Sequence, residues 1–165
     1  MSETAIALRR ATVEDVPVIL QLVRDLAEYE REPGSVVATE ADFVRDGFGP
    51  TPLFEVLLAD VGQGTERQPV GFALYFFQYS TWRGRPTLYL EDLFVQPAHR
   101  KLGIGKAFMK RLAREAVDRD CQRFQWAVLD WNTPSIEFYE SLGAKILRDW
   151  LTARIDGDAL QRLAT

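Results

Sequence analysis

Three long apolar segments in the middle of the sequence limit the fold more than any other feature. Phe54–Val61 and Val70–Tyr79 have the composition of buried strands and are joined by the polar stretch GQGTERQ, which predicts a hairpin. After STWRGRP, the segment Thr87–Val95 predicts a third strand. Consecutive strands of this kind indicate a sheet rather than a helical bundle.

Segments with helical periodicity lie on both sides of these strands. The short strand Ala5–Ala11 leads into a helix that begins at Thr12, and a second helix begins at Thr39 and ends near Gly47. In both, an aspartate three residues after the threonine resembles a capping box. The segment Lys106–Asp120 has apolar residues every four positions and predicts an amphipathic helix.

The last third of the chain continues the alternation of strands and helices. Arg123–Trp131 predicts a buried strand, Asn132–Gly143 a short helix with Pro134 in its first turn, and Lys145–Ile155 a final strand. The order is β-α-α-β-β-β-α-β-α-β, which is a mixed α/β arrangement with a mixed sheet. The chain has 165 residues and no repeat or linker, so we expect one domain, 1–165.

Charge and cysteine content exclude several classes of protein. The formal net charge of −4 argues against generic nucleic-acid binding and favours cationic partners. Cys121 is the single cysteine, so no intrachain disulfide forms. The N-terminus lacks the pattern of a secretory signal, and no apolar run approaches the roughly 20 residues that span a bilayer. We therefore expect a soluble cytoplasmic protein without a membrane partner.

The segment HRKLGIGKAF places two glycines at a strand-to-helix junction. A Walker loop is excluded because Ala107 follows Lys106, and a dinucleotide fingerprint is excluded because position 108 is Phe108. The remaining pattern, R-x-x-G-x-G, suits a helix N-terminus whose bare N–H groups bind a phosphate. The basic residues around it favour a pyrophosphate. The alternative is a helix start where the glycines serve only the turn and the charges are solvated.

Further motifs connect this segment to a family. RKLGIG after YLEDLFV, followed by AVLDWNTPSIEFYESLGA, resembles the Gcn5-related N-acetyltransferases. LVRDLAEYE, DGFG and YSTWRGR are similar to the spermidine/spermine (diamine) branch, and YSTWRGR and AVLDWN to its thialysine-acetylating members. The resemblance covers nearly the whole chain. It implies the acetyltransferase fold, acetyl-coenzyme A as co-substrate, a small cationic amine as substrate, and a homodimer.

The resemblance also implies which residues bind the co-substrate. They comprise a pyrophosphate loop, a strand edge that pairs with the pantetheine amides, and contacts on the following strand and helix. These residues are Arg100, Lys101, Leu102, Gly103, Ile104, Gly105 and Lys106; Leu93, Phe94 and Val95; Gln125, Trp126 and Ala127; and Asn132, Thr133, Pro134 and Ser135. Lys101 stands where many members have glycine, which a backbone contact tolerates.

The resemblance assigns Glu91 as the base and Tyr139 as the acid of acetyl transfer. An alkylamine must lose a proton before it attacks, and a phenol with a pKa of about 10 can protonate a departing thiolate. Adjacent strand residues point to opposite faces, so only one of Glu91 and Asp92 is expected to enter the cleft. The alternatives are a solvated carboxylate for Glu91 and a core tyrosine for Tyr139.

The expected amine-binding residues are Tyr29 and Glu30, together with Glu91 and Asp149. An acidic cleft for the cationic amine is expected from Glu28, Glu30, Glu91, Asp92 and Asp149. A merely acidic surface would have the same composition. The loop REPGSVV is less acidic than a long polyamine requires, which argues against spermine. No metal-ligand spacing is present. Two other functions stay open: a protein or peptide N-acetyltransferase, and a catalytically silent acyl-coenzyme A-binding module.

Overall fold

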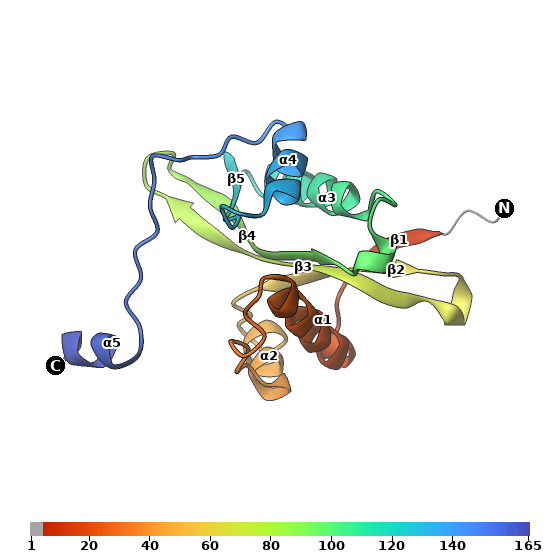
Figure 1. The fold of residues 1–165 in the computed structure, drawn as a ribbon, viewed down its shortest axis with the longest axis horizontal. Coiled ribbons are helices and arrows are strands. Elements are labelled where there is room, and N and C mark those ends of the chain that lie inside the picture. Colours follow the sequence, from red (N-terminus) through yellow and green to blue (C-terminus); the bar gives the residue numbers. More distant parts are fainter. Residues whose placement is uncertain (1–4) are drawn as a thin grey trace. The chain divides into compact units, whose positions relative to one another are not determined.

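The computed structural model describes residues 5–165, which form two compact units. The first ends at Ala127 and the second runs from Val128 to Thr165, and each is described by itself. The first unit contains a five-stranded sheet (Figure 1). Its strands are β1 (Ile6–Arg10), β2 (Glu55–Val61), β3 (Gln68–Ser80), β4 (Arg85–Val95) and β5 (Arg123–Trp126).

The strands lie in sequence order across the sheet. Neighbours from β1 to β4 are antiparallel, whereas β4 and β5 are parallel. The predicted hairpin is confirmed, with Glu55 opposite Tyr75 and Val61 opposite Gln68. The mixed sheet follows from the connections, because β4 and β5 are joined through a helix that returns the chain to the same end.

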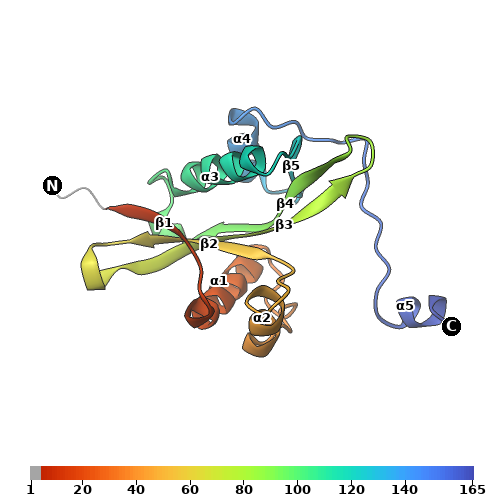
Figure 2. The same ribbon diagram turned by 180° about the vertical axis from the view of Figure 1, so that it is seen from behind.

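Helices cover both faces of this sheet. α1 (Val16–Tyr29) and α2 (Glu40–Gly47) lie on one side, and α3 (Ile104–Asp118) lies on the other (Figures 1 and 2). Three short 3₁₀ turns complete the unit: η1 (Val13–Asp15), η2 (Gly64–Glu66) and η3 (Pro97–His99). The predicted helices in this unit are therefore confirmed.

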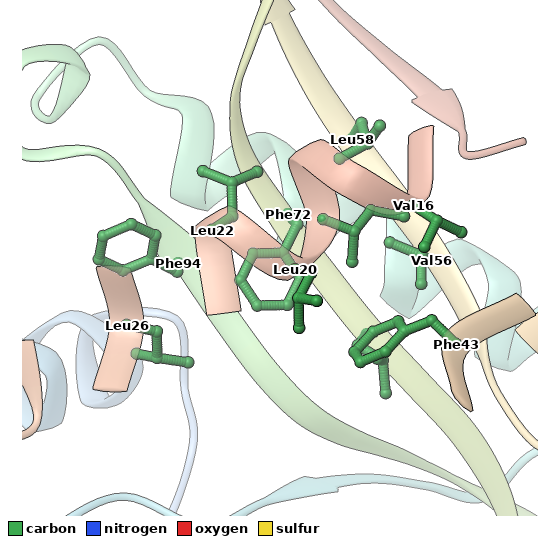
Figure 3. Close-up of a cluster of buried hydrophobic side chains, with 11 residues drawn as sticks. Val16, Leu20, Leu22, Leu26, Phe43, Val56, Leu58, Phe72 and Phe94 are labelled. Carbon is green, nitrogen blue, oxygen red and sulfur yellow. The ribbon is translucent and has the colours of Figure 1, made fainter. Parts of the chain in front are cut away.

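The core under α1 joins the helix to β2, through Val56 and Leu58, and to β3 and β4. Leu20, Leu22 and Leu26 of α1 pack with Phe72 of β3 and Phe94 of β4, and all five are buried (Figure 3). Burying such side chains contributes roughly 1.5–3 kcal/mol each. The apolar stripe of α1 thereby fixes the end of the helix next to the end of β4, which matters for the site below.

Local signals position the helix starts. Thr39 N–H donates to Asp42 Oδ2 at 2.9 Å while Asp42 N–H donates to Thr39 Oγ1 at 3.3 Å, so the capping box is reciprocal. Thr12 N–H donates to Asp15 Oδ2 at 2.8 Å, although the turn that follows is 3₁₀ and α1 begins only at Val16. Both predicted capping pairs are confirmed.

The second unit differs from the prediction. It contains α4 (Thr133–Ser141) and α5 (Gly157–Leu163), and the sequence analysis missed α5. The predicted strand Lys145–Ile155 is wrong, because this segment contains only a turn and irregular backbone. A strand needs a neighbouring ladder, and β propensity alone does not supply one. The predicted strand Arg123–Trp131 is too long, since β5 stops at Trp126.

Candidate functional site

The end of β4 has one edge without a strand beside it. β4 pairs with β3 along its whole length but with β5 only from Thr87 to Leu90. The outer backbone groups of Glu91–Val95 therefore have no strand partner within the described residues. One of them, the carbonyl of Val95, accepts a bond of 2.9 Å from Arg100 Nε. Such an edge suits an extended ligand with amide groups, which pantetheine is.

The predicted alternation of side chains between the two faces of the sheet fails at Glu91, because this residue forms a β-bulge. Asp92 lies opposite Leu74, and Leu90 lies opposite Tyr75, so Glu91 is an extra residue between them. Leu74 belongs to the core under α1, and paired residues share a face. Asp92 therefore faces the α1 side of the sheet. Tyr75, with its hydroxyl 3.1 Å from Glu55, marks the opposite face.

Three carboxylates gather where α1 ends beside β4. Burial raises the pKa of Asp92 to about 7, and the charges of Glu91 and Glu30 act in the same direction. Burial also raises the pKa of Glu30, the residue that caps α1. Glu91 itself is exposed. This acidic group, defined as Glu30, Glu91 and Asp92, is a place where a cation would be stabilised.

The glycine loop opens α3 as predicted. Gly103 is the N-cap and has a left-handed φ of 81°, and it offers no side chain to cap the helix. The first helical backbone bond is Ala107 N–H to Gly103 O at 2.9 Å, so the N–H groups of Gly103–Lys106 precede the helical ladder. Lys101 has a φ of 66°, and Lys106 is exposed. These donors and charges fit a pyrophosphate.

Arg100 has a position that the sequence did not suggest. Its guanidinium carbon lies 4.6 Å from the ring centroid of Tyr29 and 5.7 Å from that of Phe94. Together with the bond to the carbonyl of Val95, these contacts join the loop, the end of α1 and the end of β4. Tyr29, the last residue of α1, gave no signal of this contact, which depends on the fold.

The structure brings most of the predicted site residues of the first unit together. Tyr29 and Glu30 end α1, Glu91 and Leu93–Val95 end β4, and Arg100–Lys106 form the loop into α3. Gln125 and Trp126 lie on β5, with Ala127 directly after it. Leu102 is exposed on the loop and Ile104 is buried beneath it. Asp92, which the sequence analysis placed in the acidic cleft but not in the role of base, is the more buried of the two adjacent carboxylates.

The other predicted residues belong to the second unit. Asn132 is the N-cap of α4, and its side-chain oxygen accepts from Ser135 N–H at 3.4 Å. Thr133 and Pro134 form the first turn, as expected for a proline there. Tyr139 is 8% exposed, with its ring centroid 5.3 Å from that of Phe138. Asp149 lies in an exposed turn after α4.

Residues 5–165 contain neither a cluster of metal ligands nor a helix that could span a membrane. No group of three or more histidine, cysteine, aspartate or glutamate side chains in this part of the chain is arranged to hold a metal ion. Over the same residues, every helix is too short or too polar to cross a membrane.

Comparison with known proteins identifies the family. The profile of the Acetyltransferase (GNAT) family matches residues 19–144. Thialysine N-epsilon-acetyltransferase of Sus scrofa is 40% identical over 167 residues, which cover 97% of this chain and 98% of that protein. Spermidine/spermine N(1)-acetyltransferase-like protein 1 of Homo sapiens is 41% identical over 140 residues, which cover 83% of this chain and 20% of that protein.

A solved structure has the same architecture over its full length. An integron cassette protein from the mobile metagenome of V. cholerae superposes with a TM-score of 0.79 at 26% identity, covering 96% of this chain and 97% of that one. The β4–β5 ladder ends at Leu90, and a glycine caps α3. Both features lie within residues 19–144, which the family profile matches. This chain belongs to the Acetyltransferase (GNAT) family and is an N-acetyltransferase that uses acetyl-coenzyme A.

Proposed function

We propose that this enzyme acetylates a primary amine of a small diamine, a polyamine or a thialysine-like substrate, by direct attack in a ternary complex. The observation that carries this proposal is the acidic group of Glu30, Glu91 and Asp92 beside the open edge of β4. A substrate with a second cationic centre would neutralise these carboxylates. The 40% identity to a thialysine N-epsilon-acetyltransferase supports the same substrate class.

We assign the binding of acetyl-coenzyme A mainly to backbone groups of the first unit. We place its pyrophosphate at the N–H groups of Gly103–Lys106, with Arg100, Lys101 and Leu102 in the preceding loop, and its pantetheine along Leu93–Val95. Gln125–Ala127 and Asn132–Ser135 are assigned the further contacts. Acetyl-coenzyme A supplies the acetyl group as a thioester. The chain itself must orient this group, exclude water from it and move two protons.

The two proton transfers are assigned to Glu91 and Tyr139. Glu91, acting through water, accepts the proton that the substrate ammonium loses, and the neutral amine nitrogen then attacks the thioester carbonyl carbon. A carbon–nitrogen bond forms, the carbon–sulfur bond breaks, the sulfur leaves as a thiolate, and the acylated nitrogen releases its second proton to solvent. Tyr139 donates its phenolic proton to that thiolate and regains one from solvent. Asp92, with its raised pKa, is a second acceptor for the ammonium proton.

The substrate contacts are assigned to Tyr29, Glu30 and Glu91, with Asp149 of the second unit as a further carboxylate. We propose that both units act as one N-acetyltransferase domain over 1–165, since the family match crosses the boundary between them. We place the enzyme in the cytoplasm, with no nucleic-acid or membrane partner. The formal net charge of −4 supports the exclusion of nucleic acid.

We also propose that the enzyme is a homodimer. Large apolar side chains of the irregular segment Lys145–Ile155 are exposed, with exposed fractions of 58% for Leu147, 71% for Trp150 and 91% for Leu151. Large exposed apolar side chains that lie close together in the sequence favour a contact surface in this segment. The solution mass at micromolar concentration tests this proposal, and a monomer contradicts it.

A substrate screen tests the proposed activity. The enzyme is incubated with acetyl-coenzyme A and a panel of diamines, polyamines, thialysine, lysine and peptides, and released thiol is measured. We expect turnover with the small amines that carry two cationic groups. Turnover with peptides alone would make the enzyme a protein N-acetyltransferase instead. Binding of acetyl-coenzyme A without turnover on any acceptor would indicate a silent acyl-coenzyme A-binding module.

A further inference from the structure

Arg100 makes three contacts that join parts of the proposed site. Its Nε donates to the carbonyl of Val95 at 2.9 Å, which anchors the side chain to the end of β4. Its guanidinium lies over the rings of Tyr29, at 4.6 Å, and of Phe94, at 5.7 Å. The planar guanidinium suits this geometry, since it can stack on a ring and donate in its plane at the same time.

The three partners belong to different functional parts. Phe94 is a buried member of the core, and Val95 is the last residue of the strand assigned to pantetheine. Tyr29 is the last residue of α1 and directly precedes Glu30 of the acidic group. Arg100 also directly precedes the loop Lys101–Gly103 in the sequence, so its backbone is continuous with that of the loop.

The end of α1 is a turn of the backbone directly beside the acidic group. The backbone leaves the helix at Glu30, and Arg31 has a left-handed φ of 67°. The amides of Glu30, Arg31 and Glu32 donate to carbonyls near the end of the same helix, at 2.8–3.0 Å. The side-chain stack on Arg100 is therefore a contact through which the loop into α3 can stabilise this turn.

From this arrangement we propose that Arg100 is a positioning residue that couples the co-substrate loop to the amine site. Binding of coenzyme A to the loop fixes Arg100, and Arg100 then holds Tyr29 and the last turn of α1 in place. By thermodynamic linkage, an amine bound beside Tyr29 strengthens coenzyme A binding by the same factor. The inference rests on the proposed function for the location of both ligands.

Hydrogen exchange with coenzyme A as the probe tests this coupling without any amine. In the unaltered enzyme, saturating coenzyme A should slow exchange in the loop Lys101–Lys106. It should also slow exchange of the Glu30–Glu32 amides, by about fivefold or more, the usual lower range of coupling between sites. In Arg100→Gln the loop should stay protected at saturation while Glu30–Glu32 exchange as they do without the ligand.

Matched variants separate coupling from loss of binding or folding. Arg114→Gln removes an exposed arginine of α3 and should leave both effects intact. Tyr29→Leu leaves the loop unaltered and removes the ring, so it should abolish protection at Glu30–Glu32 only. Tyr29→Phe keeps the ring and should retain it. Thermal melting confirms that each variant is folded.

Two results would overturn the inference, and they differ. If Arg100→Gln and Tyr29→Leu both retain ligand-induced protection at Glu30–Glu32, or if the unaltered enzyme never shows it, Arg100 does not couple the sites. If coenzyme A binds but leaves Lys101–Lys106 unprotected, the proposed location of the co-substrate is wrong and the coupling fails with it. The first result concerns the α1 peptide, and the second concerns the loop peptide.

Discussion

Asp92 lies opposite Leu74 across the β3–β4 ladder, and this pairing turns its carboxylate toward the sheet face that α1 covers. The neighbouring Glu91 is the extra residue of the bulge and stays exposed. Because one residue is inserted in the strand, the two adjacent carboxylates lie in different surroundings: the one of Glu91 is solvated, and the one of Asp92 is half-buried. The half-buried surroundings of Asp92 raise its pKa to about 7, which the following predictions use.

Replacement of Asp92 by asparagine should change how stability depends on pH. Because the pKa of Asp92 is raised to about 7 in the folded state, folding favours its protonated form. Burial of this carboxyl has no effect on stability below about pH 4, lowers stability as the pH rises from about 4 to 7, and has its full effect above 7. Asp92→Asn should therefore be more stable than the unaltered enzyme at pH 8, by on the order of 2 kcal/mol or more, with a smaller difference at pH 5 and nearly equal stability at about pH 4.

Urea unfolding of both proteins without ligands across this pH range measures the effect. Asp118→Asn, which removes an exposed aspartate at the end of α3, serves as the control for a lost charge. A stability difference between Asp92→Asn and the unaltered enzyme that does not vary with pH would contradict the prediction.

The two carboxylates should also differ in activity. Glu91→Gln should lower kcat by about 10²-fold, the usual contribution of a positioned base, with little effect on melting. Asp92→Asn should mainly shift the acid limb in the pH profile of kcat/KM. The midpoint of this limb is expected to report the carboxyl of Asp92, whose pKa is raised to about 7. The measurement is kcat and kcat/KM between pH 6 and 9 with the best amine of the screen. The opposite pattern, with the loss in Asp92→Asn alone, would make Asp92 the base.

Replacement of Gly105 by valine should block co-substrate binding. Gly105 is in the first turn of α3, where its bare N–H group is assigned to the pyrophosphate. A branched side chain would hinder the approach of the phosphate, so coenzyme A affinity should fall. Gly105→Ala is the matched control with a smaller side chain and should bind more tightly than Gly105→Val. Unchanged affinity in a folded Gly105→Val protein would refute this placement of the pyrophosphate.

The protein should be more stable with glycine than with lysine at position 101. Its φ of 66° lies in the left-handed region, which costs a side-chain-bearing residue about 1 kcal/mol. Lys101→Gly should therefore raise the free energy of unfolding by up to about 1 kcal/mol. Gly103→Ala should lower the free energy of unfolding, because its φ of 81° strains a residue that has a side chain. No described atom lies within 4 Å of the added methyl group, so a steric clash does not contribute to this effect. Denaturant unfolding checks both, and equal stability of all three proteins would contradict it.

Several elements could be predicted because their signals are local. The capping pair of Thr39 and Asp42, the periodic apolar residues of α3 and the glycine at its N-cap each act within one turn of the chain. The bulge at Glu91 could not be predicted, because it depends on the register between β3 and β4. The contact of Arg100 with Tyr29 joins residues far apart in the sequence and depends on the fold as well.

The segment Lys145–Ile155 shows why β propensity misleads. Its isoleucines, leucines and tryptophan are frequent in strands, yet the segment is irregular and Leu151 is 91% exposed. β propensity measures how a side chain fits a half-buried pleated surface, and it has no effect unless a neighbouring strand provides that surface. The sequence alone does not say whether such a neighbour exists.

Tyr139 offers the sharpest separation between a catalytic and a structural role. The side chain is 8% exposed and lies on α4 beside Phe138, so burial alone would justify a tyrosine there. Tyr139→Phe keeps the packing of the ring and removes the phenolic proton. If that proton goes to the departing thiolate, kcat should fall by about 10²-fold or more while the melting temperature barely changes.

The structural alternative gives a different pair of results. A buried hydroxyl that serves only the core contributes about 1 kcal/mol to stability and little to the rate. Tyr139→Phe would then melt earlier and turn over at nearly the unaltered rate, which would leave proton donation to water or to the ammonium product. Tyr79→Phe is the matched control, because Tyr79 is 69% exposed on β3, outside the proposed site. The measurement is kcat at saturating amine and acetyl-coenzyme A, together with thermal melting of the same preparations.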